Sequence, residues 1–102
     1  MGIYTWDMRS NALALPAGLH RREREAWHRL APQVERAVRE HTGEPPRPGD
    51  ALIFRELVGA TAILEWLQEE ARRPGVVHVE VGEALREWRA IVSGWKRALL
   101  LA

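Results

Sequence analysis

The chain has 102 residues, of which 46% are apolar and 28% charged, a composition typical of one small globular domain. It contains no cysteine, which excludes a disulfide framework, a thiolate nucleophile and an iron–sulfur cluster. Fifteen basic and fourteen acidic residues give a net charge of +1, which argues against a strongly basic nucleic-acid-binding coat but leaves local patches open. All basic residues except Lys96 are arginine, which suggests a GC-rich genome and a thermophilic source.

The N-terminal segment, residues 1–18, lacks the charged-then-apolar order of a signal peptide. The longest uninterrupted apolar run, residues 98–102, is far below the roughly 18 residues of a membrane span, so we expect a cytoplasmic protein with no membrane partner. Residues 3–8 are mostly apolar and include Tyr4 and Trp6. Because such a segment is too short to fold alone, we expect residues 1–18 to form an extended arm that docks on its own core or on a neighbour.

Clusters of Pro and Gly divide residues 19–102, which we expect to form a single all-α domain of three to four helices. The first helix is predicted over about residues 20–41, where apolar residues recur along one helical stripe. Pro32 interrupts this stripe. Because proline removes a backbone hydrogen bond and clashes with the preceding turn, we expect a kink or a break near Pro32.

The next helix is predicted over residues 50–73, beginning at an Asp50 N-cap. It is apolar on more than one side, which is typical of a helix that is central in its fold or lies between subunits. Gly59, in the middle of this helix, lowers helix stability by about 1 kcal/mol relative to alanine. Its presence predicts a close backbone contact at that position. The last helix is predicted over residues 82–101, and the β-branched residues before it, 76–81, favour a short extended stretch.

No group of residues points to catalysis. The four histidines lack partners at metal-ligand spacing, and the carboxylates alternate with arginines at helical spacing, which is typical of solvated ion-pair faces. Gly43 is followed closely by prolines, which supply no N–H groups to a phosphate, so no phosphate-binding loop is present. We therefore predict a protein that is not an enzyme and has no metal or cofactor.

Two groups of basic residues are candidates for phosphate contacts, although a solvated helix face is the simpler interpretation of each. One lies at the start of the first helix, and the other covers about a third of the circumference of the last helix. Apolar and aromatic residues of the arm and of the middle helix are candidates for contacts between subunits. These candidate interface residues are Tyr4, Trp6, Ile53, Ile63 and Trp66.

Two phrases in the first third of the chain carry a resemblance: Leu15-Pro16-Ala17-Gly18-Leu19 and, after a charged turn, Ala26-Trp27-His28-Arg29-Leu30-Ala31-Pro32-Gln33-Val34. Together with the Pro-Gly-Asp50 start of a long helix and a last amphipathic helix, they resemble one group of small terminase subunits of tailed bacteriophages. The resemblance implies a non-enzymatic, ring-forming, all-α subunit. Such a subunit binds viral double-stranded DNA and presents it to a large ATPase–nuclease subunit in the host-cell cytoplasm.

Assembly into a ring would multiply a weak basic patch into a continuous cationic belt with salt-sensitive affinity for DNA. Because the resemblance is best at the start of the first helix, that group is the first choice for DNA contacts and the last helix is the second. Two other functions stay open: a small phage or bacterial regulator that binds and modulates a host protein, and an all-α backbone-binding subunit of a nucleic-acid complex. The first-choice residues are Arg21, Arg22, Arg24 and Arg29, and the second-choice residues are Arg86, Arg89, Lys96 and Arg97.

Overall fold

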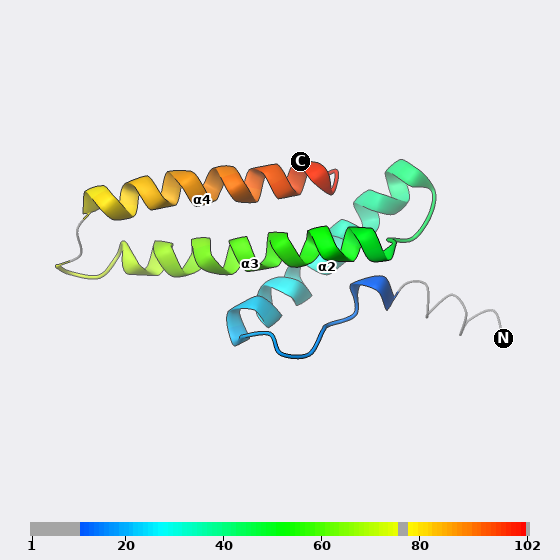
Figure 1. Cartoon of the computed structure of the whole chain (residues 1–102), viewed down its shortest axis with the longest axis horizontal. Coiled ribbons are helices and arrows are strands. Elements are labelled where there is room, and N and C mark those ends of the chain that lie inside the picture. Colours follow the sequence, from blue (N-terminus) through cyan, green and yellow to red (C-terminus); the bar gives the residue numbers. More distant parts are fainter. Residues whose placement is uncertain (1–10, 76–77, 102) are drawn as a thin grey trace.

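The computed structural model describes residues 11–75 and 78–101, and these contain three α-helices, one short 3-10 turn and no strand (Figure 1). The all-α fold predicted from the hydrophobic periodicity is therefore confirmed. The elements are η1 (Asn11–Leu13), α2 (Arg21–Thr42), α3 (Pro48–Glu70) and α4 (His78–Ala98).

Helix α2 continues through Pro32 as one helix, so of the expected kink or break the break is not found. Pro32 is exposed, and the one backbone bond that it removes would have gone to the carbonyl of His28, which is exposed as well. On the opposite side of α2, Trp27, Leu30 and Val34 are buried. The buried stripe on both sides of the proline keeps the two halves of α2 against α3, which outweighs the loss of one solvent-exposed hydrogen bond.

Helix α4 begins at His78, four residues before the expected start, so residues 78–81 are helical and not extended. Glu80 lies in the first turn, where a negative charge interacts favourably with the helix dipole, and Val81 is half-buried on the packed side of α4. Tertiary packing thus overrides the preference of valine for strands. Residues 76 and 77, the rest of the expected extended stretch, lie outside the described residues.

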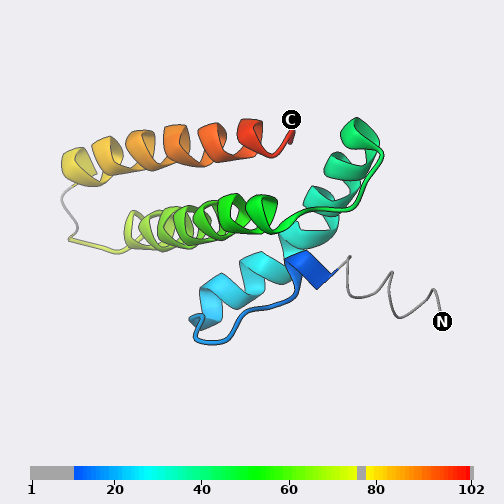
Figure 2. The same ribbon diagram turned by 45° about the vertical axis from the view of Figure 1, so that its right-hand side comes forward.

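Helix α3 is the central element (Figures 1 and 2). It runs antiparallel to α4 and packs along it, while α2 crosses its other side at an angle. The chain turns between the two long helices around Gly75, whose positive φ of 82° is a left-handed conformation that suits glycine. Both views show the end of the α3–α4 hairpin near this turn extending beyond α2.

The core lies where the three helices meet. Phe54 and Leu57 of α3 are fully buried, and the ring of Phe54 lies 4.4 Å from that of Trp27, measured between ring centroids. Leu99, just after α4, is also buried, as the unbroken apolar stripe of the last helix predicts. Within α4 itself, Val92 is the one buried residue. The hairpin therefore leaves much apolar surface only partly covered.

Candidate functional site

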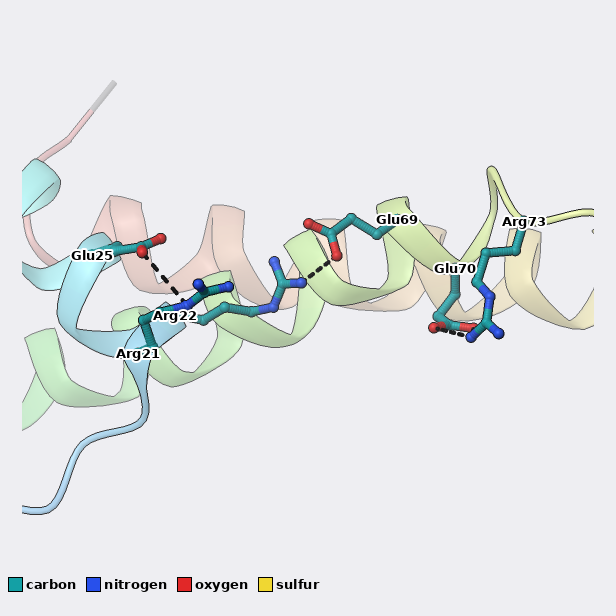
Figure 3. Close-up of polar contacts among 6 residues, drawn as sticks. All are labelled: Arg21, Arg22, Glu25, Glu69, Glu70 and Arg73. Carbon is teal, nitrogen blue, oxygen red and sulfur yellow. Dashed lines mark hydrogen bonds and ion pairs between the residues drawn. The ribbon is translucent and has the colours of Figure 1, made fainter.

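Two of the four arginines predicted to bind DNA on α2 form ion pairs with α3, and Figure 3 shows one of these pairs. Arg22 pairs with Glu69 of α3, and the Nη2 atom of Arg29 lies 2.9 Å from the Oε2 atom of Glu65 on the same helix. The two glutamates are four residues apart and the two arginines seven, so each pair of residues lies along one side of its helix. These contacts fix how α2 crosses α3, and they partly neutralise two of the four arginines predicted to bind DNA.

The other two predicted contacts on α2 differ from each other. Arg24 donates a hydrogen bond of 2.6 Å from Nη1 to the backbone carbonyl of Leu19, which ties the start of α2 to the preceding loop. Arg21 is exposed, and its Nε atom lies 3.7 Å from the Oε1 atom of Glu25 on the same helix. Among the four, Arg21 is therefore the most available to a partner. Figure 3 shows Arg22 reaching Glu69 of α3, while Arg21 contacts Glu25 on its own helix.

The Arg22–Glu69 ion pair shifts the pKa of both side chains. The hydrogen bond from the Arg22 guanidinium, followed by the charge of Arg22, holds the pKa of Glu69 below its ordinary value, while partial loss of water around the carboxylate opposes this effect. The same hydrogen bond raises the pKa of Arg22. Because Glu69 is more acidic in the folded chain than in the unfolded chain, its ionised form stabilises the fold at neutral pH.

Substituting Glu69→Gln is therefore expected to lower the stability of the protein slightly at pH 7 and by less as the pH falls. The stabilisation is fully present above the pKa of an unfolded glutamate, about 4.3, and is lost as the pH falls through the lower folded-state pKa. Denaturant midpoints measured from pH 7 to pH 3 should show the difference between wild type and variant narrowing. Glu56→Gln, an exposed control on the same helix, should show no such narrowing. A difference independent of pH would contradict the assignment.

The second group of predicted DNA contacts, on α4, has a different environment. Within the part of the chain that the structure describes, none of these four cations forms a hydrogen bond or an ion pair. Lys96 is half-buried and the other three are exposed. At about 100° per residue they share one side of α4, and two of them lie in its last turn, where the helix dipole favours positive charge. The group comprises Arg86, Arg89, Lys96 and Arg97.

The outer face of α3, which packs against neither α2 nor α4, is the main uncovered apolar surface. Three of its side chains are well exposed: Leu52 at 70%, Ile63 at 38% and Trp66 at 50%. At helical spacing, Gly59 lies between Leu52 and Ile63 on the same face. The breadth of the apolar pattern predicted such a surface, since a helix in contact with two neighbours needs no third apolar side.

The predicted interface residues occupy different environments in this structure. Ile63 and Trp66 lie on the outer face of α3, as an interface requires, whereas Ile53 packs against the core. Leu52, which the sequence interpretation missed, takes the outward position, because neighbouring residues on a helix point about 100° apart. Tyr4 and Trp6 lie outside the described residues.

A hollow of about 550 Å³ lies where the outer face of α3 meets the first turn of α2. Its apolar side consists of Gly59, Ala62, Ile63 and Trp66, and its polar rim is formed by residues 20–23. The rim is held in shape because the Oε1 atom of Glu23 accepts a hydrogen bond of 3.1 Å from the backbone N–H of His20. Such a hollow can take an apolar side chain and offers Arg21 to a negative charge beside it.

Comparisons of the chain with protein-family models, curated proteins and solved structures found no match. Among the described residues, no three side chains of the kinds that bind metals gather into a possible ion site. None of the described helices combines the length and apolar character needed to cross a bilayer. Two surfaces of the described chain are the candidates for a functional site: the cations of α4 and the outer face of α3.

Proposed function

We propose that this protein is a non-enzymatic, self-assembling subunit that binds the backbone of viral double-stranded DNA and presents it to a large ATPase–nuclease subunit. The observation that carries the proposal is the row of four cations on α4 without partners in the described chain. Duplex DNA carries one negative charge per roughly 1.7 Å of its axis, so a rigid helix that holds four cations on one side can present them to several phosphates at once. The sequence resemblance to small terminase subunits supports the same function.

The cations of α4 take precedence over those of α2 in this proposal. Ion pairs to Glu65 and Glu69 already satisfy Arg29 and Arg22, so a phosphate would have to compete with a carboxylate at each. No such competition exists for α4 among the described residues. Figure 1 also shows α4 at the edge of the molecule, with α3 between it and the start of α2.

Self-assembly supplies the affinity that one subunit lacks. The net charge of +1 is small, and a single row of four cations binds DNA weakly at physiological salt. In a closed oligomer the rows of all subunits act together, so the effective concentration raises the overall affinity. The exposed Ile63 and Trp66 provide apolar surface for contacts between subunits.

Reversing the charge of Arg86 and Arg89 to Glu in one variant is expected to lower the affinity for duplex DNA by about tenfold or more. The slope of log affinity against log salt should become shallower by about 0.9 for each phosphate that the variant no longer neutralises. Fluorescence anisotropy with a labelled duplex, measured between low and physiological salt, gives both quantities. Unchanged binding would contradict the assignment to α4.

The matched control is Arg36→Glu with Arg72→Glu, which makes the same change in net charge on exposed positions outside α4. It should retain most of the affinity of the wild type. Equal losses in both variants would show a dependence on net charge alone. Sedimentation of the same preparations checks the assembly, because a wild type that is monomeric at micromolar concentration would contradict the proposed function.

A further inference from the structure

The hollow beside Gly59 has the properties of a binding site that the described chain leaves open. Apart from its chain neighbours and the nearby backbone of its own helix, a Cβ atom placed on Gly59 would meet no atom of the described chain within 4 Å, so the described residues do not make the close contact predicted at this glycine. Ile63 and Trp66 border the same space and are 38% and 50% exposed. The volume of about 550 Å³ lies within the range of ligand pockets, roughly 300–1,000 Å³.

The rim of this hollow adds a charge preference. Arg21 lines it and is exposed, and its only pairing among the described residues is the long contact with Glu25. Arg22, which also lines it, is directed toward Glu69 (Figure 3). A ligand that fits both parts of the hollow combines a large apolar side chain with a neighbouring carboxylate.

We infer that this hollow binds the aromatic N-terminal segment, residues 3–8, of a second copy of the chain. The segment reads Ile-Tyr-Thr-Trp-Asp-Met, and within it Asp7 follows Trp6 directly. Trp6 supplies the apolar side chain for the space beside Gly59, and Asp7 supplies the carboxylate for Arg21. The segment itself lies outside the described residues, and the inference rests on the proposed self-assembly.

The occupant is assigned to a second copy because the proposed function requires contacts between subunits, and this contact joins two different surfaces of the chain. The chain that follows the segment is anchored at Leu13, which lies beside Trp27 and Pro32, whereas the hollow is at residues 20–23, nearer the start of α2. A contact between two different surfaces leaves one donor and one acceptor unused in every open chain of subunits, and only a closed ring uses them all. Such a head-to-tail contact forms the ring that the proposed function requires where the rotation between subunits closes, and an open filament where it does not.

Two variants separate the donor from the acceptor. Trp6→Ala removes the donor side chain, and Gly59→Leu fills the hollow. Gly59→Leu should not impair folding, because the Cβ atom of the new residue meets no close neighbour and leucine favours helix more than glycine does. Circular dichroism verifies that both variants fold. Sedimentation at equal concentration should show that each variant alone is monomeric, or associates at least about tenfold more weakly than the wild type.

Mixing the two variants in equal amounts is the decisive step. The Gly59→Leu chain keeps its segment and the Trp6→Ala chain keeps its hollow, so one contact can form between them and the mixture should sediment as a one-to-one dimer. A mixture that stays monomeric, or a Gly59→Leu variant that still assembles as the wild type does, would overturn the inference. Leu52→Ser, on the same helix but outside the hollow, is the control and should still assemble. A monomeric wild type would instead overturn the proposed assembly itself.

Discussion

Replacing Phe54 with alanine is expected to lower the free energy of unfolding by about 3–5 kcal/mol. Phe54 is fully buried, and its ring lies 4.4 Å from that of Trp27, with an angle of 55° between the ring planes. Truncation removes buried apolar area and this aromatic contact, and it leaves a cavity between α2 and α3. A domain of this size has a total stability of roughly 5–15 kcal/mol, so the variant should retain only a fraction of it.

Urea denaturation followed by circular dichroism measures this loss directly. The matched control is Leu52→Ala, two residues earlier on the same helix, where the side chain is 70% exposed and the expected change is within about 0.5 kcal/mol. Both substitutions change an apolar residue of α3 to alanine, so the contrast isolates burial from helix propensity. Similar losses at the two positions would mean that α2 does not pack on α3 as described.

The fold was largely predictable because its helices repeat their apolar residues with a period of 3.6. The exact residues at which the helices begin were less predictable. Pro48 begins α3 two residues before the Asp50 expected as its N-cap, and His78 begins α4 inside a run of valines. Proline at the first helical position has no N–H that the helix needs, and Val79 and Val81 are helical because the stripe that packs on α3 includes Val81.

The candidate site was predictable only in part, because its geometry depends on contacts between helices. The basic cluster does lie in the first turns of α2, but the ion-pair partners Glu65 and Glu69 are 36 and 47 residues away in sequence. Local spacing contains no information on how α2 crosses α3. The breadth of the apolar surface on the middle helix predicted a helix that is central in the fold or lies between subunits. Which of the neighbours Leu52 and Ile53 faces outward is decided by where α4 packs.

Substitution of Trp27 tests how the start of the described chain is held in place. Trp27 is 3% exposed, and its Nε1–H donates a buried hydrogen bond of 2.7 Å to the carbonyl of Leu13. Trp27→Phe keeps most of the apolar area but leaves that carbonyl without its donor, which should cost about 1–3 kcal/mol. Trp27→Ala also removes the contact with Phe54 and should cost about 3–5 kcal/mol. Denaturation of both variants beside the wild type gives the two values.

The Trp27→Phe variant should lose more than global stability, because the hydrogen bond joins two distant parts of the sequence. Leu13 anchors the loop that leads to His20, and His20 belongs to the rim of the hollow beside Gly59. Hydrogen exchange should therefore become faster over residues 13–20, while α3 and α4 keep their protection. Uniformly faster exchange would show that Trp27 supports only the common core. Selective loosening of residues 13–20 would connect the aromatic core of the protein to the surface through which its subunits are proposed to join.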